Sequence, residues 1–156
     1  MLLAVLEDAL FAGLAAAAFA ILFNVPRRTL GPCIVTGAVG HALRYALVHA
    51  MGLGLVPATL VAAIVIGAFA QLFGRLLRVP WTVFAITGAI PVVPGALAFQ
   101  TMIGALRVAG ATAGTADLDG TLTVALRTGL VLGAIGVGIG LPTLIARRAK
   151  ETDLAS

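Results

Sequence analysis

Two ionisable side chains, His41 and Arg44, lie three residues apart in the segment GAVGHALRYALVH. At this spacing they share one face of a helix. A histidine can bind and release a proton near neutral pH, so His41 is a candidate for carrying a coupling proton. An arginine pairs well with carboxylates, so Arg44 is a candidate for binding a carboxylate substrate. The alternative is structural: His41 bonds across a helix interface, and Arg44 extends its charge towards water.

The segment GAIPVVPGALAFQ contains Pro91, Pro94 and Gly95 within five residues. Each proline removes a backbone donor and disfavours helix at the residue before it. Pro94 followed by Gly95 suits the restart of a helix. The restarted helix would begin with free N–H groups around Gly95, Ala96 and Leu97, which form an electropositive end that favours anions. We therefore expect Pro91, Pro94, Gly95 and Ala96 to contribute to a substrate site.

The composition shows what kind of chain must position these groups. Of the 156 residues, 61% are hydrophobic and only 10% are charged. A soluble domain of this length cannot bury so much apolar surface. The apolar runs are continuous rather than alternating, which indicates helices in a lipid bilayer rather than strands of a barrel. The predicted fold class is an all-α integral membrane protein.

We predict five membrane spans in a single transmembrane domain, residues 1–150, with a short tail at 151–156. Prolines, glycines and basic residues separate the apolar runs and place the spans at about residues 7–23, 30–50, 53–73, 81–106 and 122–146. The fourth span is broken at its central Pro-x-x-Pro-Gly element. In the fifth, Gly136 and Gly140 have the GxxxG spacing, which predicts a close helix contact within the chain or with another subunit.

The break is expected near the middle of the bilayer. From Trp81 to Ile90 a helix rises roughly 15 Å, about half of a hydrocarbon core, and His41 lies at a similar depth in the second span. Irregular backbone at this depth is tolerated only next to protein or a water-filled cavity, and broken helices line substrate sites in many secondary transporters. The alternative is a simple proline kink repaired by neighbouring helices.

Two further polar side chains are candidates for substrate binding. Gln100 follows the break by about two helical turns and could line a polar path or bond to another helix. Arg127 lies early in the fifth span and could assist a substrate or extend to the interface.

The sequence has no P-loop, no HExxH motif and no GxSxG turn, so we expect no enzyme activity and no cofactor. The single cysteine, Cys33, excludes a cysteine-based metal site, and we expect no bound metal. We expect no Asp or Glu inside a span, so His41 or a partner would have to carry a coupling proton.

Basic residues are distributed unevenly over the expected connections. Seven Lys and Arg residues follow spans one, three and five, whereas Arg107 alone lies on the other side. The positive-inside rule then places the N-terminus outside and the C-terminus in the cytoplasm. The net charge of +4 is a topology signal rather than a sign of nucleic-acid binding.

Three segments together resemble the threonine/serine exporter family: FNVPRRTL, GAVGHALRY and IPVVPGALAFQTM. The most specific element is formed by Pro91, Pro94 and Gly95. The resemblance extends over about residues 4–146 and is to the short membrane half of the family, which in many bacteria is a separate subunit.

The resemblance implies a transport unit of about ten spans in the bacterial cytoplasmic membrane, formed with a companion five-span subunit. Members are linked to threonine and serine export, and a split two-subunit form is linked to export of dicarboxylates, in particular succinate. We therefore expect a subunit of a secondary exporter for small carboxylate-bearing metabolites. The alternatives are a non-transporting membrane partner that stabilises a larger subunit, or a small homo-oligomeric channel.

Overall fold

The computed structural model describes residues 2–110 and 117–155, with side chains described for 2–110 and 117–145. All regular structure in these residues is helical, which confirms the all-α class. The elements in chain order are α1 (Leu2–Leu22), η1 (Arg27–Thr29), α2 (Leu30–His49), α3 (Leu55–Leu77), α4 (Thr82–Ala89), η2 (Ile90–Val92), α5 (Gly95–Gly110) and α6 (Leu118–Ala155), where η denotes a 3₁₀ helix.

The predicted number of five spans is not confirmed. By length and apolar composition, three helices in the described residues could cross a membrane: α1, α3 and Leu118–Ile145 of α6. Thr82–Val92 and Gly95–Gly110 pass this test only as a pair, and they bend by 62° at the break, so they form either one broken span or a re-entrant loop. The helix α2 is not among the candidates because His41 and Arg44 lower its mean hydropathy.

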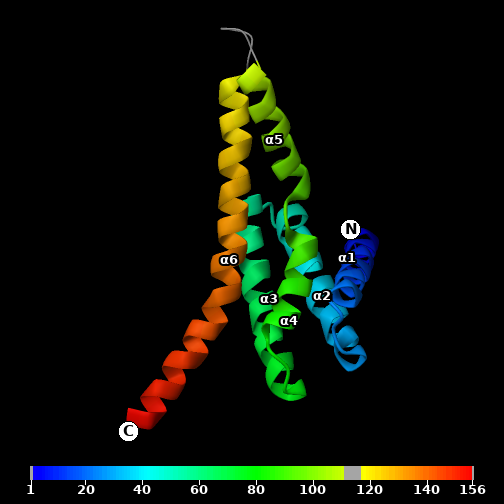
Figure 1. Cartoon of the computed structure of the whole chain (residues 1–156), viewed down its shortest axis with the longest axis vertical. Coiled ribbons are helices and arrows are strands. Elements are labelled where there is room, and N and C mark those ends of the chain that lie inside the picture. The colour runs from blue at the N-terminus through cyan, green and yellow to red at the C-terminus, as the bar shows by residue number, and fades with distance from the viewer. Residues whose placement is uncertain (1, 111–116, 156) are drawn as a thin grey trace.

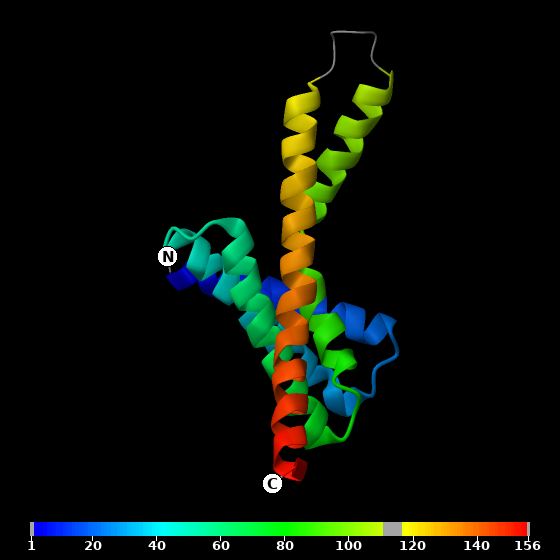
Figure 2. The same cartoon turned by 90° about the vertical axis from the view of Figure 1, so that its left-hand side faces the viewer.

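The helices form a bundle with a projecting hairpin. Helices α1 to α4 form the bundle and α3 packs against α6, whereas α5 lies along the upper half of α6 and rises with it beyond the bundle (Figures 1 and 2). The strongest helix contacts are α1 with α2 and α3 with α6. The α4–η2 segment lies inside the bundle, against α1, α2 and α3. The break therefore lies where the bundle meets the hairpin.

Small residues let the helices approach closely. A Cβ added at Gly37 would lie 2.6 Å from the Ala16 side chain, and one added at Gly40 would lie 2.4 Å from Ile66. At the α3–α6 crossing, a Cβ at Gly67 would lie 2.6 Å from the backbone oxygen of Ile139. Without a hydrophobic driving force between helices in lipid, such close packing provides much of the attraction.

The predicted GxxxG contact does not form within the described part of the chain. A Cβ at Gly136 or Gly140 would meet nothing within 4 Å. The close contact is made instead by Gly138, where a Cβ would lie 2.6 Å from Ala63 and 2.9 Å from the Leu60 carbonyl oxygen. The glycine between the two predicted positions therefore faces α3, and Gly136 and Gly140 face away from it.

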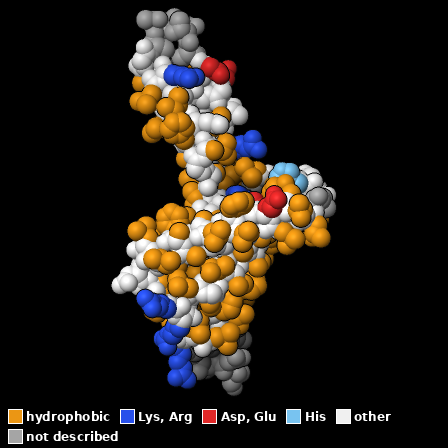
Figure 3. All heavy atoms as spheres, turned by 90° about the vertical axis from the view of Figure 1, so that its right-hand side faces the viewer, with side chains coloured by type: hydrophobic (Ala, Val, Ile, Leu, Met, Phe, Trp, Pro, Cys, Tyr) orange, Lys and Arg blue, Asp and Glu red, His pale blue; other side chains and the backbone are white. Residues whose placement is uncertain are grey.

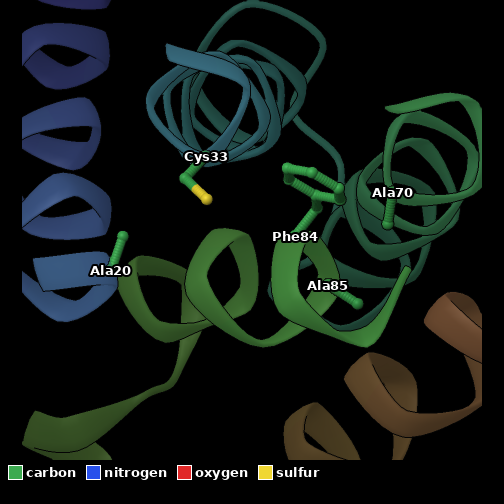
Figure 4. Close-up of a cluster of buried hydrophobic side chains, with 5 residues drawn as sticks. All are labelled: Ala20, Cys33, Ala70, Phe84 and Ala85. Atoms are coloured by element: carbon green, nitrogen blue, oxygen red, sulfur yellow. The ribbon is translucent and has the colours of Figure 1, made fainter. Parts of the chain in front are cut away.

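A buried apolar cluster holds one end of the bundle together. Ala20, Cys33, Ala70, Phe84 and Ala85 come from four helices and converge there (Figure 4). The α1–α2 and α3–α4 connections pack around this cluster, so both connections lie at the same end of the bundle. Four of the predicted cytoplasmic arginines belong to these connections or the adjoining turn of α3: Arg27, Arg28, Arg75 and Arg78.

The α3–α6 crossing gives a matched test of this packing. We expect Gly138→Ala to destabilise the protein by about 1–3 kcal/mol, because the new methyl group overlaps Ala63 and the Leu60 carbonyl. Gly136→Ala, on the same helix, is expected to be neutral or slightly stabilising, since alanine is the better helix former. The free energy of unfolding in detergent measures both. Equal effects of the two substitutions would show that Gly138 does not set the helix spacing.

Candidate functional site

The interruption between α4 and α5 follows from the prolines. After α4 the chain forms the 3₁₀ turn η2, and Val93 then adopts an extended conformation with φ −60° and ψ 129°. Neither Pro91 nor Pro94 can donate a backbone hydrogen bond, and Pro94 favours the extended conformation at Val93. The chain therefore resumes as a helix only at Gly95, in a direction that differs by 62°.

The first turn of α5 is partly open. The Gly95 N–H donates to the Val93 carbonyl oxygen at 2.9 Å, so the expectation that this group is free is wrong. The next N–H group, that of Ala96, lies in the first helical turn, where no intrahelical acceptor exists, and Ala96 is exposed. A Cβ at Gly95 would meet nothing within 4 Å. The accessible electropositive end therefore starts at Ala96.

A chain of hydrogen bonds joins α1 and α2 to the break. His41 Nδ1 lies 2.6 Å from Asp8 Oδ2, and Arg44 Nη2 lies 2.7 Å from His41 Nε2. Arg44 Nη1 donates to the carbonyl oxygen of Val92 in η2 at 2.6 Å. We call Asp8, His41, Arg44 and the Val92 carbonyl the polar network. It places the Arg44 guanidinium at the carbonyl end of the α4–η2 segment, where the helix dipole is negative.

The proton positions on His41 follow from its neighbours. A guanidinium can only donate, so the Nε2 atom that faces Arg44 must accept and carries no proton. The proton of the neutral ring is then on Nδ1, which donates to the Asp8 carboxylate. In this arrangement His41 is a neutral relay between an anion and a cation, and the Asp8 and His41 side chains are both 19% exposed.

Asp8 is the member of the network that sequence reasoning missed. The expectation that no acidic residue lies inside a span is wrong, because Asp8 lies in the second turn of α1, a candidate span that begins at Leu2. The spacing of the small residues does show on which face of α1 Asp8 lies, although not what it contacts. Ala12, Ala16 and Ala20 are buried at intervals of four, and Asp8 extends the same stripe by one step, whereas its neighbour Glu7 is exposed.

The structure divides the predicted site residues into two groups. His41, Arg44 and Pro91 lie in or beside the network, and Pro94, Gly95 and Ala96 follow it directly. Gln100 and Arg127 belong to the α5–α6 hairpin and are exposed. Gln100 lines a cavity of about 240 Å³ between the two hairpin helices together with Arg107, Asp117 and Thr121.

A second cavity lies beside the break and is apolar. Its volume is about 320 Å³, and its lining is formed mainly by α4 and η2 residues with Ile139 of α6. Such a lining suits a hydrocarbon chain rather than a carboxylate. The groups at the break that can bind a carboxylate are therefore Arg44 and the open end of α5.

A family assignment covers most of the chain. Residues 8–145 match the family described as threonine/serine exporter, ThrE. The chain belongs to this family. The resemblance predicted from the sequence is thus confirmed. Together with its long apolar helices, this assignment indicates a multi-pass membrane protein.

A relative in Haemophilus influenzae shows how the chain compares in length. The two are 35% identical over 150 residues, which is 96% of this chain and 50% of that uncharacterised protein. The chain therefore spans about half the length of this relative. No solved structure matches the chain.

The contribution of the network to stability can be measured at Asp8. We expect Asp8→Ala to lower the free energy of unfolding by about 1–3 kcal/mol, because the His41 Nδ1–H loses its acceptor in a partly buried place. The adjacent, exposed Glu7 provides the control, and Glu7→Ala is expected to change stability by less than about 0.5 kcal/mol. Equal losses would mean that the Asp8–His41 bond does not hold α1 on α2.

Proposed function

We propose that the chain is one subunit of a secondary exporter for small metabolites that carry a carboxylate, either threonine and serine or dicarboxylates such as succinate. The observation that carries the proposal is the Arg44 guanidinium, held at the carbonyl end of a broken helix in a member of an exporter family. Arginine binds a carboxylate through two parallel hydrogen bonds, and a helix start attracts the same negative charge.

In this proposal the substrate binds where η2 passes into α5. Pro91, Pro94 and Gly95 shape the opening, and the Ala96 N–H together with Arg44 binds the carboxylate. The absence of overlap around Gly95 supports an accessible site, since a side chain there would meet open space. Gln100 and Arg127, on the hairpin, assist the substrate as it moves along α5 and α6. His41 carries the coupling proton.

The proposed partner is a companion subunit of the same family. Large hydrophobic side chains of the hairpin are widely exposed, among them Phe99 (60%), Leu126 (68%) and Leu130 (60%). Figure 3 shows hydrophobic side chains over most of one face of the molecule, with charged side chains in small separate groups. A relative of twice the length is consistent with a second half that packs against this hairpin, with lipid covering the remainder.

The proposed location is the bacterial cytoplasmic membrane, with the N-terminus outside and the C-terminus in the cytoplasm. Arg27, Arg28, Arg75 and Arg78 support this orientation because the connections that hold them meet at one end of the bundle. The C-terminal part of α6 points towards this same end (Figure 1). Under the positive-inside rule this end faces the cytoplasm.

Transport is tested with proteoliposomes loaded with labelled threonine, serine or succinate, with the chain alone and with the companion subunit. We expect saturable efflux only with the companion. Arg44→Ala and Gly95→Leu should each reduce efflux by about tenfold or more, because one loses the carboxylate partner and the other fills the opening.

The matched control for Gly95→Leu is Gly31→Leu, since Gly31 is an exposed helical glycine near the start of α2, outside the hairpin, that also meets nothing within 4 Å. Its efflux should equal that of the unmodified chain. Full efflux from folded Arg44→Ala and Gly95→Leu proteins would overturn the site, and efflux from the chain alone would favour a homo-oligomeric channel. Absence of efflux from a folded complex would favour a stabilising partner.

A further inference from the structure

We infer that Asp8 and His41 form a proton-operated latch that decides whether Arg44 is bound to the break or free to bind a carboxylate. The inference assigns a positioning role to Asp8. It concerns regulation of the proposed substrate site, and its transport consequence rests on the proposed function.

The first step is the incompatibility of a second proton on His41 with the present position of Arg44. The Nε2 atom of His41 accepts from Arg44 Nη2 at 2.7 Å. A proton that binds to Nε2 turns this acceptor into a donor, so that two N–H groups and two positive charges face each other. Arg44 must then leave His41.

The second step couples this departure to the backbone at the break. The guanidinium is planar and rigid, so Nη1 and Nη2 move together. When Nη2 leaves His41, Nη1 is drawn away from the Val92 carbonyl oxygen, to which it donates at 2.6 Å. Proton uptake at one side chain thereby frees both a guanidinium and a carbonyl at the junction of α4–η2 with α5.

Asp8 determines which nitrogen of His41 receives the proton. Its carboxylate accepts from Nδ1–H at 2.6 Å, which holds the neutral ring in the tautomer with an empty Nε2. Without this acceptor the ring could also carry its proton on Nε2. Arg44 would then lose its hydrogen-bond acceptor on His41 with no change of pH. Asp8 therefore acts through His41 and need not touch the substrate.

No other charged group in the described residues competes for this role. Glu7 on α1 is exposed, and Arg27 and Arg28 of η1 lie near the start of α2. Helix α3 carries only Arg75, near its last turn, and α4 and η2 have no charged side chain. On α2 itself, Tyr45 stacks on His49, whose Nδ1 bonds to the Tyr45 carbonyl oxygen.

Nuclear magnetic resonance of the full chain in liposomes tests the latch without any substrate. Val92 and Val93 form the only Val–Val pair in the sequence, so valine labelled with ¹³C at its carbonyl and with ¹⁵N gives a single directly bonded signal from the Val92 carbonyl. The chain has two histidines, and His49→Asn leaves ¹⁵N-histidine signals from His41 alone.

We expect acidification to protonate His41 Nε2 and, over the same pH range, to shift the Val92 carbonyl signal to its position in Arg44→Ala. In His41→Gln, whose amide can both donate to Asp8 and accept from Arg44, the Val92 signal should not move with pH. In Asp8→Ala the neutral His41 ring should show a mixture of tautomers, and part of the Val92 signal should already lie at the Arg44→Ala position. A merely structural role for Asp8 would leave the tautomer unchanged.

Two spectroscopic outcomes would overturn the latch: a Val92 signal that moves equally with pH in His41→Gln, or one that stays fixed while His41 titrates. In the transport assay, efflux by the complex should vary by about tenfold or more over the pH range of His41 protonation, as expected for one charge-assisted hydrogen bond. In His41→Gln this pH dependence should disappear, at the lower efflux expected of a variant that cannot carry the coupling proton. If the signals behave as expected but no folded complex transports, the latch is supported and the exporter proposal fails.

Discussion

The arrangement of the bundle depends on one constraint, which is that backbone carbonyl groups in an apolar environment must find donors. Two prolines take away donors just where α4 ends, and Val92 is fully buried there. An unpaired carbonyl in such a place is costly. The carbonyl oxygen of Ile90 accepts a hydrogen bond from the Val93 N–H at 3.1 Å, and the carbonyl oxygen of Val92 accepts one from Arg44. The hydrogen bonding of the backbone at the break is therefore completed by a side chain from another helix.

This solution creates a second requirement, because a charged guanidinium inside an apolar bundle needs an opposite charge. Asp8 supplies this charge. His41 lies between Asp8 and Arg44 and forms a hydrogen bond with each of them. The small residues of α1 and α2 make the connection possible. The two helices pack closely because the residues buried between them have very small side chains: Ala12, Ala16 and Gly37. A short carboxylate on α1 can therefore reach a ring on α2.

The sequence predicted the parts of this structure that depend on local chemistry. The helical class follows from continuous apolar runs, and the change of direction near Pro91 and Pro94 follows from the missing donors and the restricted backbone. The family followed from the same residues and two other segments. His41 and Arg44 were recognised because ionisable groups are costly in apolar surroundings.

The features of the structure that could not be predicted depend on which helices pack against each other and through which faces. The role of Asp8 required the true start of α1 and the contact between α1 and α2, and no spacing within either helix gives that contact. The same holds for Gly138. Gly136 and Gly140 share one face of α6 and Gly138 lies on the opposite face, so which of them packs closely depends on how α6 is rotated against α3. The predicted number of five spans is not confirmed, because His41 and Arg44 lower the mean hydropathy of α2 and the α4–α5 pair is bent.

The length of α6 has a geometric consequence. The helix has 38 residues, which at 1.5 Å per residue is about 57 Å, nearly twice the thickness of a hydrocarbon core. Its membrane-competent part, Leu118–Ile145, has 28 residues and already measures about 42 Å, so it can stay within the hydrocarbon only if it tilts. The ten residues beyond Ile145 continue the same helix for about 15 Å. Pro142 lies inside this helix and removes one of its backbone hydrogen bonds, so α6 can bend at this point and its two ends need not turn as one body.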